Sequence, residues 1–81
     1  MSVMEKLRTE QPMRNLNHNL VHTLSKKLDA VTRYSIYIND AEEQGCPECA
    51  EIFRRFKEEE MRHIQELRDQ ICRHCQEGNF R

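Results

Sequence analysis

Apolar residues recur at helical spacing along two long stretches of this chain. Positions 13–43 contain no glycine or proline, and their apolar side chains follow steps of three, four or seven residues: Leu20, Leu24, Val31, Tyr34, Ile38 and Ala41. Such spacing places side chains on one face of an α-helix. Positions 47–76 repeat the pattern with Phe53, Phe56, Ile64, Leu67 and Ile71. The sequence therefore predicts two amphipathic helices, about 13–43 and about 47–76, each with one buried stripe.

A short turn separates the two predicted helices. Gly45 follows the first helix and Pro47 opens the second, which are stop and start signals for helices. Because so few residues connect them, the helices must run antiparallel. Residues 1–12 are weakly periodic and end at Pro12, so we expect a flexible N-terminal arm before the hairpin domain 13–81.

A two-helix hairpin leaves apolar surface that it cannot cover by itself. The chain has 81 residues, of which 37% are apolar and 33% charged, a balance too polar for a thick core. The simplest partner for the remaining surface is a second copy. The predicted fold is therefore all-α: an antiparallel hairpin that forms a homodimer, or a higher oligomer, as a four-helix bundle.

Charge and hydropathy narrow the classes of partner. The net charge is −1, and acidic and basic residues are interspersed along most of the chain without a basic stripe, so nucleic acid is not expected to bind. No apolar run approaches the roughly 20 residues that span a membrane. The first dozen residues lack the apolar stretch of a secretory signal, so we expect a cytoplasmic location.

Three charged or titratable side chains interrupt the buried stripes. Lys27 lies on the stripe of the first helix, and Glu60 and His63 lie on that of the second. At i and i+3, a Glu-x-x-His pair projects from one helical face and could share a metal ion. A carboxylate or an ammonium in a core must be paired or must coordinate something.

The stretches LSKKLDAVTRYSIYINDA (24–41) and FRRFKEEEMRHIQEL (53–67) resemble one helical hairpin of the ferritin-like superfamily. The likeness is to rubrerythrin-type domains and to encapsulated ferritins. The latter are half-length chains that dimerise inside a protein compartment, where two half-sites form a di-iron centre. The resemblance implies iron oxidation or storage at a dimer interface. It assigns Glu60 and His63 as ligands and puts Lys27 where the family has a glutamate.

This lysine leaves two interpretations of the site. Asp29 could supply the missing carboxylate, so that Asp29, Glu60 and His63 bind a metal. Alternatively the site holds no metal, and Lys27 forms an ion pair with Glu60 while His63 is hydrogen-bonded nearby. A protonated lysine repels a cation and cannot replace a bridging carboxylate.

Four cysteines form two C-x-x-C pairs, Cys46 with Cys49 and Cys72 with Cys75. This pattern is typical of zinc ligands. On a continuous helix the two pairs lie about 39 Å apart, too far to share one metal. An antiparallel second copy could place each pair beside the other pair of its partner, as an inter-chain disulfide or zinc site. A redox pair at the helix N-terminus, or plain packing of the cysteines, are the alternatives.

Three functions follow from these observations. The first is a ferritin-like protein that binds iron or another metal at a dimer interface. The second is a metal-free structural or interaction module held together by its helices and by inter-chain cysteine pairs or zinc. The third is a thiol redox sensor. The sequence leaves open whether the protein is an enzyme.

Overall fold

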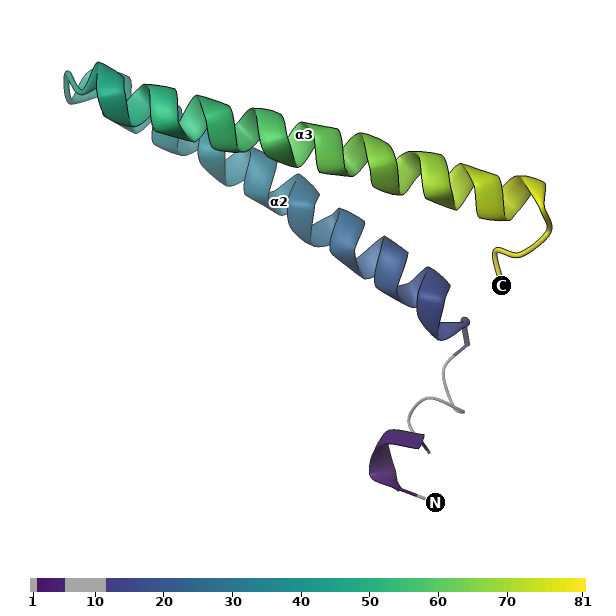
Figure 1. The fold of residues 1–81 in the computed structure, drawn as a ribbon. Coiled ribbons are helices and arrows are strands. Elements are labelled where there is room, and N and C mark those ends of the chain that lie inside the picture. Colours follow the sequence, from purple (N-terminus) through teal and green to yellow (C-terminus); the bar gives the residue numbers. More distant parts are fainter. Residues whose placement is uncertain (1, 6–11) are drawn as a thin grey trace.

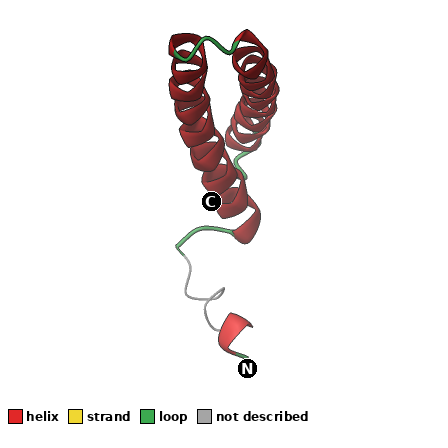
Figure 2. Cartoon of the chain, turned by 90° about the vertical axis from the view of Figure 1, so that its left-hand side faces the viewer, coloured by secondary structure: helices red, strands yellow, loops and turns green. Residues whose placement is uncertain are grey.

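The computed structural model describes residues 2–5 and 12–81 and consists of a helical hairpin. Helix α2 covers Asn15–Glu43, and helix α3 covers Pro47–Gln76. The two helices pack against each other along their length and run in opposite directions (Figure 1). The described residues form helices and loops only, as Figure 2 shows. The predicted antiparallel hairpin is confirmed, and the helices begin and end within two residues of the expected positions.

The reversal of the chain is built from two backbone hydrogen bonds. Gly45 has a φ of 72°, a left-handed conformation that costs glycine little because it has no Cβ. Its N–H donates to the carbonyl of Glu42 at 3.1 Å, and the N–H of Cys46 donates to that of Ala41 at 2.9 Å. These bonds form a Schellman motif, after which Pro47 begins α3. Residues 44–46 therefore connect α2 to α3, and the backbone N–H of each of them is hydrogen-bonded.

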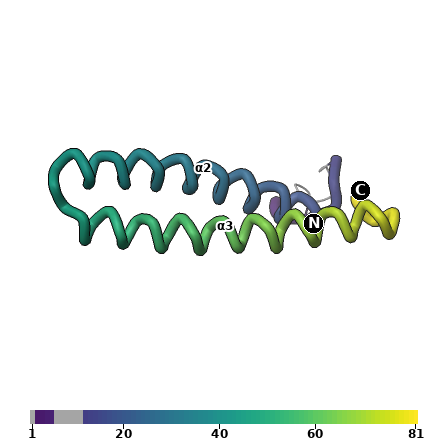
Figure 3. The backbone as a smooth tube through the Cα atoms, turned by 90° about the horizontal axis from the view of Figure 1, so that it is seen from above, coloured from purple at the N-terminus to yellow at the C-terminus, as the bar shows by residue number. Residues whose placement is uncertain are grey.

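The contact between the helices is a seam in which steps of three and four residues alternate. The helices overlap near the turn in Figure 1 and near their other ends in Figure 3, so they wrap around each other. The buried or half-buried positions that follow these steps on α2 are Asn17, Leu20, Leu24, Lys27, Val31, Tyr34, Ile38 and Ala41. Those on α3 are Ala50, Phe53, Lys57, Glu60, Ile64, Leu67, Ile71 and His74. This seven-residue repeat is the pattern of an antiparallel coiled coil.

The predicted buried stripe of α3 is wrong at one position. Phe56 is 42% exposed to solvent, whereas Phe53 is half-buried. The next seam position after Phe53 is Lys57, four residues further along α3. Phe56 is only three residues after Phe53 and therefore lies beside the seam. Phe56 still contacts α2 at its edge, because its ring centroid lies 5.9 Å from that of Tyr34.

A buried asparagine closes the end of the hairpin opposite the turn. Asn17 is 1% exposed, and its Nδ2 donates to the carbonyls of Asn79 at 2.7 Å and Arg81 at 3.2 Å. Its Oδ1 can then only accept, so it takes the hydrogen bond from Nδ1 of His74 at 2.6 Å. His74 Nε2 in turn lies 2.9 Å from the amide of Gln70. We call these residues the Asn17 cluster.

The core along the seam is thin. Among the described residues only Ala41, Ala50 and Asn17 are buried, and every other seam position is half-buried. Two of these three buried residues are alanines, Ala41 and Ala50, and both lie near the turn. Within the described part of the chain, neither helix is long and apolar enough to cross a bilayer.

The predicted flexible arm falls largely outside the described residues, because residue 1 and residues 6–11 are not among them. Residues 3–5 are helical. Ser2 Oγ accepts from the N–H of Glu5 at 3.1 Å, and Glu5 Oε2 accepts from the N–H of Ser2 at 3.4 Å. This reciprocal pair is a capping box. Flexibility of the arm stays a prediction.

Candidate functional site

The three charged or titratable residues singled out in the seam meet at one point. The Nζ of Lys27, from α2, donates to Oε2 of Glu60 at 3.1 Å. It also lies 3.0 Å from Nδ1 of His63. Because a lysine ammonium has donors only, Nδ1 of His63 is the acceptor in this contact. The expected ion pair between Lys27 and Glu60, with His63 hydrogen-bonded beside it, is therefore present.

The cluster is half-buried. The side chain of Lys27 is 25% exposed and that of Glu60 is 19% exposed, while His63 lies at the outer edge. Partial burial strengthens the attraction of the two charges, because fewer water molecules screen them. It also raises the cost of removing either partner, since the remaining charge would be left without compensation. The ammonium thus holds both α3 side chains toward α2.

The candidate metal ligands do not come together in one chain. Asp29 is exposed and lies two positions after Lys27, about 200° around the helix at 100° per residue. In residues 2–5 and 12–81, no three His, Cys, Asp or Glu side chains form a group that could hold a metal ion. Glu60 and His63 converge, but on the nitrogen of Lys27.

An aromatic cluster lies between the Lys27 site and the turn. Tyr34 and Phe53, from the seam, have ring centroids 6.3 Å apart. Tyr37 and Phe56 lie on the same side of the seam, 5.5 Å from Phe53 and 5.9 Å from Tyr34, respectively. Tyr37 is 40% exposed and Phe56 42%. An aromatic surface therefore opens to solvent on the side of the hairpin that also carries His63.

We call this side the aromatic face. It comprises two columns with seven-residue spacing, one on each helix: Thr23, Ala30 and Tyr37 on α2, and Cys49, Phe56, His63 and Gln70 on α3. Each column contacts a seam residue of the other helix: His63 contacts Lys27, and Tyr37 contacts Phe53.

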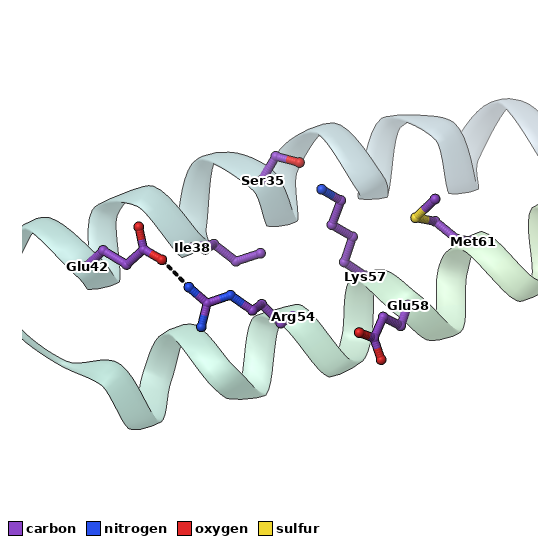
Figure 4. A pocket seen from close by; sticks show the side chains of 7 residues that line it. All are labelled: Ser35, Ile38, Glu42, Arg54, Lys57, Glu58 and Met61. Atoms are coloured by element: carbon purple, nitrogen blue, oxygen red, sulfur yellow. Dashed lines mark hydrogen bonds and ion pairs between the residues drawn. The ribbon is translucent and has the colours of Figure 1, made fainter.

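The opposite side, the charged face, has a different chemistry. An ion pair between Glu42 and Arg54 bridges the two helices there (Figure 4). The adjoining cavity is also lined by Ser35, Ile38, Lys57, Glu58 and Met61. In Figure 4 the side chain of Lys57 reaches from α3 toward α2. Charged groups rim this side of the seam near the turn, whereas further from the turn the same columns carry the exposed side chains of Val21, Leu28 and Met61.

The cysteine pairs lie at opposite ends of α3. Cys46 precedes the helix and is half-buried, Cys49 is in its first turn and exposed, and Cys72 and Cys75 are exposed in its last turns. A hydrogen bond with Cys46 raises the pKa of Cys49, and desolvation and the negative charges of Cys46 and Glu48 act in the same direction. This direction is opposite to the one that a helix N-terminus favours for the pKa of a thiol.

Sequence reasoning missed the Asn17 cluster. Asn17 lies three residues before Leu20, and His74 lies three after Ile71, so both continue the apolar stripes with polar side chains. That continuation was the available signal, because a polar residue on a buried stripe needs a partner. The partners include backbone carbonyls of residues 79 and 81, which no side-chain pattern identifies.

Together the fold and the site define a class: an antiparallel α-helical hairpin with a polar cluster in its seam and a C-x-x-C pair at its turn. No protein-family model, curated protein or solved structure matches this chain.

Proposed function

We propose that this chain is a self-associating helical interaction module in which Lys27 takes the place of a metal ion between Glu60 and His63. One observation carries the proposal: the Lys27 ammonium lies 3.1 Å from Glu60 and 3.0 Å from His63. The two side chains that could bind a metal are thus already neutralised or hydrogen-bonded within one chain. A cation arriving at that point would have to displace a like charge.

The partner that we propose is a second copy. Tyr37 and Phe56 of the aromatic face are 40% and 42% exposed. A standard interface buries about 800 Å² on each partner. Burial of such an area over the aromatic face would remove both rings from water, which favours association through the hydrophobic effect.

The charges beside the aromatic face favour one arrangement of the two copies. Lys26 and Arg33 flank the α2 column, and Glu59 and Glu66 flank the α3 column. A two-fold axis parallel to the helices places α2 of each copy against α3 of the other. The basic flank then meets the acidic flank at both edges of the interface. An axis perpendicular to the helices instead opposes like helices, with lysine and arginine near lysine and arginine.

Solution mass with a chelator present tests the self-association. We expect wild-type chain to sediment as a dimer at micromolar concentration and Phe56→Glu to sediment as a monomer. Ile36→Glu is the matched control, because Ile36 is 54% exposed and lies away from the aromatic face. Circular dichroism checks that each variant stays helical. A wild-type monomer, or equal effects of both variants, would overturn the proposal.

A charge exchange tests the arrangement of the copies. Arg33→Glu should weaken the dimer by about tenfold, since it sets like charges against Glu59 of the second copy. Adding Glu59→Lys to the same chain should restore the affinity. If the double variant is weaker than Arg33→Glu alone, the copies do not pair in this way.

The second candidate function is metal binding at the Glu60–His63 pair, as the ferritin-like resemblance implies. It is favoured by the convergence of Glu60 Oε2 and His63 Nδ1 on a single point. We expect wild-type protein to bind no ferrous iron there and Lys27→Glu to gain a site, with Lys27→Met as the uncharged control. Iron in wild-type protein that is lost in a Glu60→Ala, His63→Ala variant would reject the first proposal in favour of this one.

A further inference from the structure

The turn holds two thiols in a fixed position at the extreme tip of the hairpin. The N–H of Cys46 is bound in the Schellman motif, and its carbonyl accepts from Ala50 N–H at 3.2 Å, as α3 begins. Cys49 lies one turn further along α3. Both cysteines line a cavity of about 360 Å³, together with Tyr37 and Phe53. The backbone, rather than a flexible loop, sets the spacing of the two sulfur atoms.

The two sulfurs form half of a ligand set. Both cysteines line the same cavity at the tip of the hairpin, and Sγ of Cys46 lies 3.8 Å from Oε2 of Glu48. Asp40 lines the same cavity, but it does not join the two cysteines in a group of three metal ligands within the described residues. One chain therefore offers two thiols, and a structural zinc site requires four ligands.

We propose that Cys46 and Cys49 of two copies of this chain bind one zinc ion between the tips of the hairpins. Four thiolates at about 2.3 Å make the tetrahedral site that zinc prefers. Four thiols lose four protons to solvent as one Zn²⁺ binds, which leaves a centre with a net charge of −2 and no change of oxidation state. The positive ends of two α3 helix dipoles face that charge and stabilise it.

The tip-to-tip arrangement agrees with the charges along the aromatic face. A two-fold axis parallel to the helices brings both tips to the same end of the dimer. The alternative expected from the sequence, in which Cys46 and Cys49 meet Cys72 and Cys75 of the partner, needs copies that run in opposite directions. The zinc site extends the proposed self-association but does not depend on the aromatic face, because the tips supply all four sulfurs.

The two cysteine pairs also lie on different sides of α3. Cys49 shares its seven-residue column with Phe56 and His63 on the aromatic face. Cys75 shares its column with Arg54 and Met61, which line the cavity of the charged face. An interface formed by the aromatic face alone therefore does not bring Cys49 together with Cys75.

Zinc content and solution mass of the full chain, purified under reducing conditions, test the site. We expect one zinc per two wild-type chains, all of it lost in Cys46→Ser, Cys49→Ser and retained in the matched control Cys72→Ser, Cys75→Ser. Substituted cobalt(II) should show thiolate-to-metal charge transfer and a tetrahedral spectrum.

Each contrary result is distinguishable. One zinc per chain that is lost in both double variants would overturn the tip-to-tip site in favour of tip-to-tail pairs. Zinc-free protein with a Cys46–Cys49 disulfide after air exposure would overturn it in favour of a redox pair. If the aromatic face is not the dimer interface, the Phe56→Glu variant will still dimerise with chelator present. If Phe56→Glu is a dimer with zinc and a monomer with chelator, the result supports both the zinc site and the aromatic interface.

Discussion

The two ends of the hairpin are closed by different chemistry. At the turn, Ala41 and Ala50 are buried, and the backbone bonds of Gly45 and Cys46 reverse the chain. At the open end the buried residue is Asn17, which binds the carbonyls of Asn79 and Arg81, 62 and 64 residues away in sequence. The first closure uses neighbours in the chain, and the second joins residues that are nearly the whole chain apart.

The difference follows from the entropy of closing a loop. The helices are already joined at the turn, so small apolar residues that allow close approach are enough there. At the open end the ordering of two helix termini must be offset by specific bonds, and a side-chain amide can donate and accept at once. A second Schellman motif, in which Gly78 N–H donates to Cys75 O at 3.2 Å and Asn79 N–H to His74 O at 2.7 Å, folds the tail back onto Asn17.

Removal of Asn17 should have the largest effect. Asn17→Ala leaves the N–H of His74 and the two tail carbonyls without their partner, and should lower the free energy of unfolding by about 2–3 kcal/mol. Urea unfolding at fixed chain concentration measures the loss. Hydrogen exchange should rise first in residues 17–24 and 70–76. Asn15→Ala, at an exposed position, is the control; an equal loss there would show that the cluster contributes nothing.

Enlargement of a buried alanine tests the turn end. Ala50 is 0% exposed, so Ala50→Leu should force the helices apart near Tyr37 and cost about 2 kcal/mol. Exchange should then rise near the turn and leave the Asn17 cluster protected. Arg62→Leu, on the exposed side of α3, is the control. If Ala50→Leu is as stable as wild type, close approach of the helices is not what closes this end.

One glycine near each end of the hairpin allows the two ends to be compared at the same backbone geometry. Gly45 and Gly78 both have φ of 72°, and an added Cβ would meet no atom within 4 Å at either. Gly45→Ala and Gly78→Ala should therefore each cost about 1 kcal/mol from backbone conformation alone. We expect Gly45→Ala to slow refolding, measured by stopped-flow, because the turn must form before the helices pair. Gly78→Ala should change mainly the unfolding rate, and the reverse order would contradict this picture.

The Lys27 cluster lies between the two ends and should have the smallest effect on stability. Lys27→Met leaves Glu60 half-buried without its counter-ion, and should cost about 0.5 kcal/mol, since water still reaches the pair. The double variant Lys27→Met, Glu60→Met should recover this loss. Thermal unfolding of the two single variants and the double variant gives the coupling energy. A coupling energy of zero would show that the contact between Lys27 and Glu60 does not stabilise the fold.

Much of the site followed from residue spacing. The ion pair of Lys27 with Glu60, and His63 beside it, were expected because charged residues on a buried stripe need partners. Asp29 was considered as a ligand on chemistry alone, and helical rotation places it in solvent. Phe56 was assigned to the core because a step of three suits a helix, but the seam requires a step of four there.

The helices and the turn were determined by the sequence alone, because backbone hydrogen bonds, glycine at φ of 72° and proline at a helix start act between near neighbours. The tertiary structure decided the polar pairs that residue spacing did not predict: Asn17 with the tail carbonyls and with His74. Such pairs depend on the register and wrapping of two helices. Those are set by all the seam contacts together, and no short stretch of sequence contains them.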